Sequence, residues 1–137
     1  MLISEFAQAA ELPVETVRFY LRMGLLKPVK TLKGGSRPYA IFTAQDLDRA
    51  AKIRILQYLG YSLREIGPLV EDDATGRLSA ERSVMLLREQ FAKLNEKRAH
   101  LDRMIAFVID RIASLEDEGV PAPDFKRYLG GYANGRE

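Results

Sequence analysis

The chain has 137 residues, of which 47% are hydrophobic, and it has no cysteine. This length suits one compact domain with one extended element, and the hydrophobic content excludes wholesale disorder. The lack of cysteine excludes disulfides and thiolate metal sites. The longest strongly apolar run, residues 105–109, is far shorter than the roughly 20 residues of a membrane span, and the N-terminus lacks a secretion-signal pattern. We therefore expect a cytoplasmic protein with no membrane partner.

The net charge is only +2, but it is unevenly distributed along the chain. Residues 1–70 contain ten basic and six acidic side chains, a net of +4, whereas residues 71–137 contain eleven and thirteen, a net of −2. Residues 16–39 contain six basic side chains and no acidic one. The positive side chains of such a segment repel one another unless an anionic partner compensates their charge. The segment therefore indicates a surface that binds a polyanion, and an ordinary solvated face is the less favoured interpretation.

Two short helices joined by a tight turn are predicted at the N-terminus. Ser4 can cap the first helix. Pro13 can occupy the first turn of the second, which would end at Gly24 because glycine tolerates left-handed geometry. Arg18 and Arg22 are four residues apart and would share an outward face. The pattern is typical of a helix-turn-helix.

A basic β-hairpin is predicted next. Residues 27–30 and 39–42 can each form a short strand, and Gly34-Gly35 supplies the positive φ angles of a tight turn. A hairpin that follows a helix-turn-helix is a wing.

Thr43 and Ser62 have the sequence pattern of helix starts, the latter in a capping box. The helix after Thr43 would end at Gly60 and bury an apolar face made of Leu47, Ala50, Ala51, Ile55 and Leu59. The helix after Ser62 would end near Val70, and residues 71–76 would form a loop.

The last large element is a long helix over residues 79–118. Its apolar residues are spaced alternately by three and four, and only Arg98 interrupts them. A period of 3.5 over this length indicates a coiled coil. A forty-residue helix is roughly 60 Å long, so it needs a partner, most simply a second copy of the chain. The predicted dimerisation residues are Val84, Leu87, Phe91, Leu94, Leu101, Ile105, Val108, Ile112 and Leu115.

The basic segment lies on the two elements that winged helix-turn-helix proteins present to DNA. Lysine and arginine neutralise phosphates, and arginines on the second helix can reach guanine edges. Phe19 and Tyr20 could pack on sugars or, for the tyrosine, donate to phosphate, although Phe19 could equally belong to the core. These residues predict binding to double-stranded DNA.

Several motifs together resemble the MerR family of bacterial transcription regulators. They are Thr16-Val-Arg-Phe-Tyr20, Gly24-Leu-Leu, the glycine-containing wing and Leu59-Gly-Tyr-Ser-Leu-Arg-Glu-Ile66. The resemblance implies a homodimer, joined by an antiparallel pair of long helices, on a near-palindromic promoter. Many members distort the promoter spacer so that RNA polymerase engages. The free energy that this DNA deformation costs is offset by the protein–DNA contacts that it allows.

The resemblance also implies which residues touch DNA. Thr16, Arg18 and Tyr20 match the family's recognition-helix contacts. The wing allows two alignments, one with Arg37 and Tyr39 at the contact positions and one with Ala40 and Phe42, and we favour the first. The expected DNA-binding residues are Thr16, Arg18, Phe19, Tyr20, Arg22, Lys33, Arg37 and Tyr39.

The C-terminal segment, residues 119–137, is the least defined. Metal-sensing and redox-sensing relatives carry cysteines near the end of the long helix, and this chain has none. Glu116-Asp-Glu118 could bind a hard cation, but a solvated helix end is favoured. The single histidine, His100, falls on the outer side of the heptad pattern. The aromatic residues of the tail could line a pocket for an unidentified small-molecule effector, although packing on a partner chain is favoured.

The predicted fold class is mainly α, with a winged helix-turn-helix domain over residues 1–72 followed by the dimerisation helix. The predicted function is sequence-specific transcription regulation, with no cofactor, no metal and no catalytic constellation of an enzyme. Two alternatives stay open at this point. One is an architectural or partitioning DNA-binding protein, and the other is a coiled-coil adaptor that binds an acidic protein.

Overall fold

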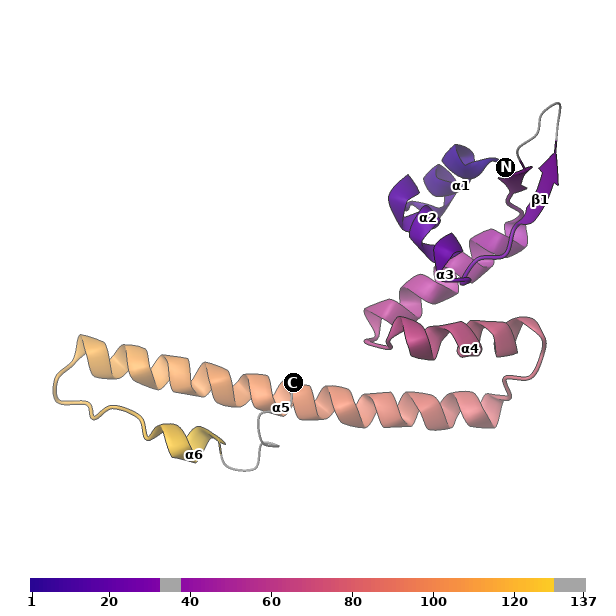
Figure 1. Cartoon of the computed structure of the whole chain (residues 1–137). Helices are drawn as coiled ribbons and strands as arrows, with labels where there is room; N and C mark the ends of the chain where they lie inside the picture. The colour runs from indigo at the N-terminus through magenta and orange to yellow at the C-terminus, as the bar shows by residue number, and fades with distance from the viewer. Residues whose placement is uncertain (33–37, 130–137) are drawn as a thin grey trace. The chain divides into compact units, whose positions relative to one another are not determined.

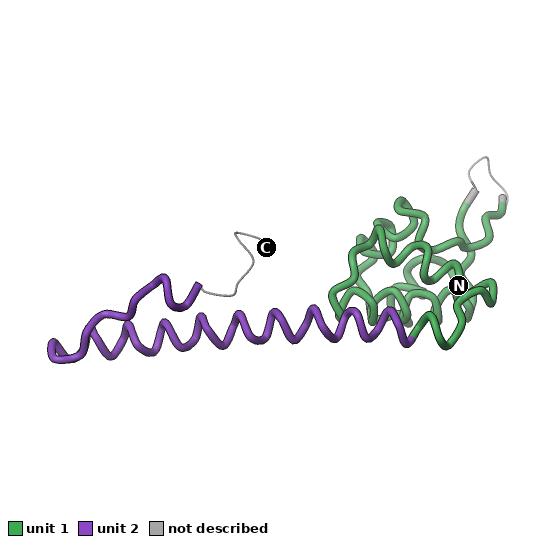
Figure 2. Tube along the Cα trace, turned by 90° about the horizontal axis from the view of Figure 1, so that it is seen from below, with its two compact units in different colours: residues 1–83 green, residues 84–137 purple. Residues whose placement is uncertain are grey.

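The computed structural model describes residues 1–32 and 38–129, which are mainly helical (Figure 1). The chain divides into two compact units, residues 1–83 and 84–137, which Figure 2 colours separately. The first unit contains α1 (Ile3–Ala10), α2 (Val14–Arg22), β1 (Val29–Leu32), β2 (Pro38–Ile41), α3 (Ala44–Tyr58) and α4 (Leu63–Ala74). Helix α5 (Ala80–Glu116) begins in the first unit and continues in the second, where α6 (Phe125–Leu129) follows it. No helix within the described ranges is long and apolar enough to cross a membrane.

Helices α1 and α2 form the predicted helix-turn-helix, but the predicted cap of α1 is wrong. The N-cap residue is Leu2, in extended geometry and without a side-chain hydrogen bond, so Ser4 lies inside the helix. Helix α1 begins earlier in the chain than predicted, because Met1 is held by two backbone hydrogen bonds to Phe42. The Met1 amino group donates to the Phe42 carbonyl oxygen at 2.9 Å, and the Met1 carbonyl oxygen accepts the Phe42 N–H at 2.7 Å. The other end of the motif is as predicted, since Gly24 has a φ of +73° just after α2.

The core of the first unit is built from one face of each helix. The rings of Phe6 and Phe42 stack with their centroids 4.2 Å apart, which ties α1 to the end of the wing. Around them lie the other members of the buried cluster: Ala7, Val17, Tyr20, Leu25, Leu26, Ala50, Ile53, Ile66 and Val70.

The buried face of α3 differs from the predicted one. Ala50 is fully buried as expected, but Ala51 is exposed and Ile55 is 62% exposed. Ile53, which the predicted face leaves out, is fully buried. Helix α3 contacts both α1 and α4, and these two neighbours select the stripe that includes Ile53 over the adjacent stripe that includes Ile55.

Both predicted helix starts are confirmed: the predicted capping box of Ser62 with Glu65 is present, and Thr43 also forms one with Asp46. In each box the side chains and backbone N–H groups of the two residues bond reciprocally, which satisfies donors that a helix start leaves open. Helix α4 runs to Ala74, so the prediction of a loop from residue 71 is wrong for residues 71–74.

The wing is an antiparallel pair in which Val29 lies opposite Ile41 and Thr31 opposite Tyr39. The observed strands begin later in β1 and earlier in β2 than predicted. The predicted turn at Gly34-Gly35 lies outside the described residues.

Helix α5 has 37 residues, which corresponds to about 55 Å at 1.5 Å per residue. The Ser79 hydroxyl accepts the backbone N–H of Arg82 at 3.1 Å and caps its start. Its predicted seam residues, including Phe91 and Leu115 at 66% exposure, are all exposed in the single chain. The single chain therefore leaves this apolar seam uncovered.

The packing of α3 gives a direct test, in which Ile53→Ala and Ile55→Ala remove the same atoms from opposite environments. We expect Ile53→Ala to lower the free energy of unfolding by about 2–5 kcal/mol, since it leaves a cavity in the core. Ile55→Ala should change it by about 0.5 kcal/mol or less. Urea denaturation followed by circular dichroism, at one protein concentration, measures both. Equal losses would contradict the observed face.

Candidate nucleic-acid interface

Helix α2 is buried on one side and basic on the other. Val17 is fully buried, while the Arg18 side chain is 53% exposed and Arg22 is exposed. Arg18 lies 3.8 Å from Glu15, an exposed pair that contributes little to stability. The Arg22 guanidinium lies 5.9 Å from the centre of the Phe19 ring, a distance at which the ring attracts the cation. Both arginines therefore extend from the exposed side of a helix whose opposite side is packed in the core.

The aromatic residues of α2 lie deeper than its arginines. Phe19 is half-buried and packs against the core. Tyr20 is only 2% exposed, and its hydroxyl donates to the Gln57 Oε1 atom at 2.6 Å. Burial raises the pKa of the Tyr20 hydroxyl, and the nearby Arg54 charge opposes this. The tyrosine thus links α2 to α3, and its contact with DNA stays a prediction.

A second bond holds the helix-turn-helix on α3. The Arg54 Nη1 atom donates to the carbonyl oxygen of Ala10 at 3.1 Å. This carbonyl belongs to the last turn of α1, where helix carbonyls have no partner within the helix. Sequence periodicity does not reveal this role, because Arg54 is an exposed cation on its own helix.

The residues of the two wing alignments differ in burial. Phe42 is 1% exposed and stacked on Phe6, and Ala40 packs against the core. The alignment that uses these two residues as contacts is therefore disfavoured. Tyr39 is half-buried on β2, and Lys30, which the sequence prediction left unassigned, is exposed on β1. The predicted contacts Lys33 and Arg37 lie outside the described residues.

Lys27 of the basic segment is paired with an acid of another helix. The Lys27 amine donates to the Glu71 Oε1 atom at 3.1 Å, and Arg49 contacts the same oxygen at 3.1 Å. The Arg49 Nε atom also donates to the carbonyl oxygen of Leu25 at 2.5 Å. The segment between α2 and the wing is therefore attached to both α3 and α4. Although residues 16–39 contain no acidic side chain, some of their basic side chains therefore contact acids from other parts of the chain.

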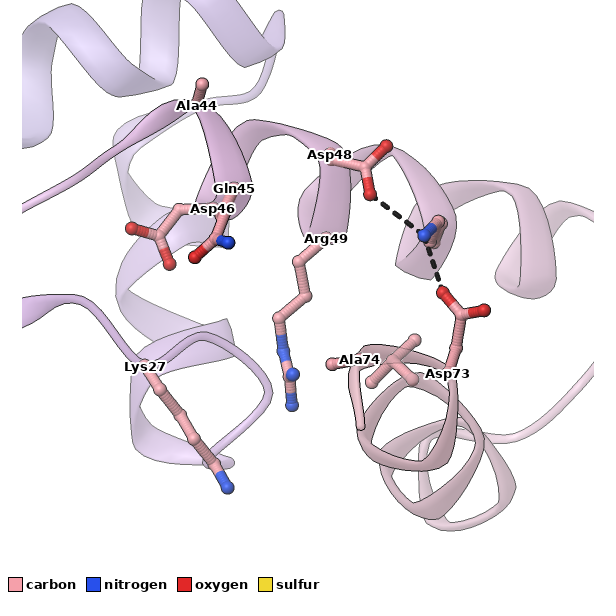
Figure 3. Close-up of a pocket in the computed structure, with 10 residues that line it drawn as sticks. Lys27, Ala44, Gln45, Asp46, Asp48, Arg49, Asp73 and Ala74 are labelled. Carbon is pink, nitrogen blue, oxygen red and sulfur yellow. Dashed lines mark hydrogen bonds and ion pairs between the residues drawn. The ribbon is translucent and has the colours of Figure 1, made fainter. Parts of the chain in front are cut away.

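A groove of about 580 Å³ lies beside this junction (Figure 3). Asp48 and Asp73 extend from α3 and α4 toward the same amine, that of Lys52, at 2.8 and 2.5 Å. Both acids raise the pKa of Lys52, mainly through these hydrogen bonds. The Lys52–Asp73 ion pair links α3 to α4 beside this groove. Its lining residues are Lys27, Ala44, Gln45, Asp46, Asp48, Arg49, Lys52, Val70, Asp73 and Ala74.

Asp72 of α4 forms an ion pair with the start of the long helix α5. Asp72 pairs with Arg82 at 2.7 Å and with Arg77 at 3.4 Å. The Arg82 hydrogen bond is the main cause of the lowered pKa of Asp72, as the Lys27 hydrogen bond is for Glu71. Residues 71–73, predicted as part of a loop, are thus a helical acidic triplet. Glu71 and Asp73 contact basic side chains of α3, and Asp72 contacts the start of α5.

Possible metal ligands do not gather in the structure. Within the described ranges, no three histidine, cysteine, aspartate or glutamate side chains are close enough to hold a metal ion. The acidic run Glu116-Asp-Glu118 begins at the last residue of α5, and the Asp117 carboxylate accepts the backbone N–H of Gly119 at 2.9 Å.

The aromatic residues of the tail contact the long helix of the same chain. Phe125 and Tyr128 contact Phe107 of the same chain's α5, with ring centroids 5.8 and 5.4 Å apart. His100, expected on the outer surface, is half-buried beside them.

A helix-turn-helix followed by a two-stranded wing, with exposed arginines on its second helix, defines a winged helix-turn-helix DNA-binding protein. The family model described as "MerR HTH family regulatory protein" matches residues 1–72, and "MerR, DNA binding" matches residues 47–116. The chain belongs to the MerR family of DNA-binding transcription regulators.

The relatives agree with this assignment. The mercuric resistance operon regulatory protein of Shigella flexneri is 37% identical over 105 residues, which cover 76% of this chain and 69% of that protein. The solved structure of HiNmlR, a MerR family regulator lacking the sensor domain, bound to promoter DNA, is 25% identical with a TM-score of 0.58, covering 84% of this chain and 89% of that chain. PbrR691 from Ralstonia metallidurans CH34, in complex with lead(II), is 25% identical with a TM-score of 0.70, covering 83% and 87%. These matches favour the regulator over the architectural and adaptor alternatives.

The paired acids of α4 predict a specific response to acid. Both Glu71 and Asp72 have pKa values below their ordinary ones, so their pairs stabilise the fold above the unfolded-state pKa. This stability is lost as the pH falls through the folded-state values. We expect the double variant Glu71→Gln, Asp72→Asn to be less stable than the wild type at neutral pH, and to lose less further stability between about pH 5 and about pH 3. Thermal unfolding across this range measures both slopes, and parallel curves would contradict the pairing.

Proposed function

We propose that the chain acts as a homodimer that binds a near-palindromic promoter through α2 and the wing, and regulates transcription by distorting the DNA between the half-sites. The observation that carries this proposal is the exposed pair Arg18 and Arg22 on a helix whose opposite side is buried. A rigid helix with arginines on its outer side fits the major groove, where arginine reads guanine. The similar protein HiNmlR was solved bound to promoter DNA.

The proposed contacts divide into two kinds. Arg18 and Thr16 on α2 would read bases, while Arg22 and the wing residues would neutralise phosphates. We add Lys30 to the predicted wing residues Lys33, Arg37 and Tyr39, because it is exposed at the base of the hairpin. Tyr20 would act mainly by positioning α2 through its bond to Gln57.

The dimer would form through the seam of α5. At 100° per residue, the predicted dimerisation residues follow one side of the helix, and all of them are exposed in the single chain. Among the described residues, the aromatic contact and the hydrogen bond that attach α6 are made to Phe107 and Asp110, which lie outside the predicted seam. Two seams packed together would bury apolar surface that is unfavourable in water. We infer an antiparallel pairing from the family resemblance, along with the engagement of RNA polymerase.

Arg18→Ala tests the recognition helix. We expect it to weaken binding to a labelled duplex from the promoter region of the chain's own gene by about 1–3 kcal/mol, and to reduce discrimination against a scrambled duplex. Fluorescence anisotropy at fixed salt measures both affinities. Arg88→Ala is the matched control, because it removes an exposed arginine of α5 and should leave the discrimination unchanged. An unchanged affinity of Arg18→Ala would contradict the proposed docking.

Leu101→Asp tests the seam, since Leu101 is a seam residue 54% exposed in the single chain. A carboxylate buried without a partner in a dimer is costly, so we expect self-association at least about tenfold weaker. Sedimentation velocity over a concentration series measures this. Ala92→Asp places the same group at an exposed position away from the seam and should leave the dimer intact. A wild-type chain that sediments as a monomer, or a Leu101→Asp dimer of normal strength, would contradict the proposal.

A further inference from the structure

Arg98 is the charged residue within the predicted apolar seam of α5, the long helix that Figure 2 shows mostly in purple. Its Nη2 atom donates to the Asn95 Oδ1 atom at 2.8 Å. Asn95 directly follows the seam residue Leu94, so this bond holds the guanidinium toward one flank of the seam. Asp102 directly follows the seam residue Leu101, one heptad after Asn95, and therefore lies on the same flank. A cation and an acid thus share one side of the seam.

Both charged side chains are exposed in the single chain. Arg98 and Asp102 remain exposed with α6 in place, and neither lines the hollow between α5 and α6 that Phe107 and Tyr128 line. Their spacing of four residues allows an ion pair within one helix. Arg98 bonds to Asn95 instead, and Asp102 forms no ion pair with another described residue. Burial of the Arg98 cation in a dimer seam is costly unless an acid accompanies it.

The antiparallel pair of the proposed function has one register in which every seam residue is covered. In this register Val84 faces the partner's Leu115, and the layers continue in order until Arg98 faces the partner's Leu101. The partner's Asp102 lies one residue, about 1.5 Å, further along the axis. In an antiparallel pair each flank of the seam faces the same flank of the partner, so this acid lies on the side where Asn95 holds the guanidinium. By the twofold symmetry the contact occurs twice.

The other registers leave Arg98 without an acid. A shift of one heptad in one direction places Arg98 opposite the partner's Val108, which Ile109 follows. The opposite shift places it opposite the partner's Leu94, which Asn95 follows. Either shift also leaves two seam residues of each chain uncovered. A parallel pair in register would bring the two Arg98 side chains into one layer, where like charges repel.

We propose that Arg98 of each chain pairs with the partner's Asp102, and that these two contacts set the register of the antiparallel dimer. The apolar layers on both sides supply the affinity, whereas a polar residue at one seam position fixes the register at some cost in stability. The inference rests on the proposed function, because it requires a homodimer through α5. In this register Leu101→Asp sets two adjacent acids against one arginine. One carboxylate stays without a partner, so the weakening expected above is unchanged.

Charge exchange tests the pair, because two weak variants rescue each other only if the contact joins two chains. Arg98→Glu places an acid beside the partner's Asp102, and Asp102→Arg places two cations together. We expect each variant alone to self-associate at least about tenfold more weakly than the wild type. In a mixture both contacts join opposite charges, so the heterodimer should form at least about tenfold more tightly than either variant homodimer. Native mass spectrometry of the full chains over a concentration series resolves the three dimers by mass.

Lys93→Glu and Glu96→Lys are the matched controls, because both residues are exposed on α5 outside the seam and its flank. Each control should self-associate like the wild type, and their mixture should show no preference for the heterodimer. A pair formed within one helix would behave in the same way, since mixing two chains does not change its charges.

Cross-linking reads the register directly, because the chain has no cysteine of its own. The double variant Leu94→Cys, Ile105→Cys should form a covalent dimer with a short bifunctional thiol reagent, since these two residues face each other across the pair. Within one chain they are eleven residues, about 16 Å, apart along the helix, which the reagent does not span. Leu94→Cys with Ile112→Cys reports the shifted register, and Leu94→Cys alone reports a parallel pair. Both should remain mostly non-covalent.

The proposal is overturned if the mixture shows no excess of heterodimer, if either charge variant alone associates like the wild type, or if Leu94 is linked to Ile112 in preference to Ile105. These failures are distinct from failure of the proposed function. A chain that dimerises and binds its promoter without charge rescue retains the function and loses this pair. A wild-type chain that stays monomeric loses both.

Discussion

The arrangement of the DNA-binding unit depends on one constraint, the burial of the inner face of α2 in the core of the first unit. Tyr20 and Val17 lie in the core, and the Tyr20 hydroxyl bonds to Gln57. Arg54 adds a bond from α3 to the end of α1. Because α2 is held from behind, Arg18 and Arg22 extend outward from a fixed backbone. A DNA-recognition helix gains specificity from this rigidity, since contacts with base edges tolerate little displacement.

Charge has two separate uses in this unit. The acidic triplet of α4, Glu71 to Asp73, neutralises cations from the wing connection, from α3 and from the start of α5. These pairs are partly exposed and therefore individually weak, yet each one links elements distant in sequence. The cations of α2 and β1 that remain on the surface, away from the triplet, are those available to a polyanion. The net charge of the chain does not reveal this division between paired and exposed basic side chains.

The second unit uses its long helix on two sides. One side carries an apolar seam that the single chain leaves exposed, and the other holds α6 through Phe107. The ring contacts that attach α6 are made by Phe107, which lies outside the predicted seam. Val108 of the predicted seam also lines the hollow between α5 and α6.

The amino-acid sequence alone determined the features that depend on local patterns. The capping residues Thr43 and Ser62, the positive φ at Gly24 and the extent of α5 follow from short-range hydrogen bonding and periodicity, which neighbouring residues decide. Only the tertiary structure decided that Ile53, not Ile55, faces the core, that Tyr20 is buried, and that Glu71 continues a helix and pairs with Lys27. It also placed His100 and Arg103 beside the aromatic residues of α6. The reason is physical: these outcomes depend on contacts between residues far apart in the chain, and a periodic pattern does not say which of two adjacent helix faces its neighbours will cover.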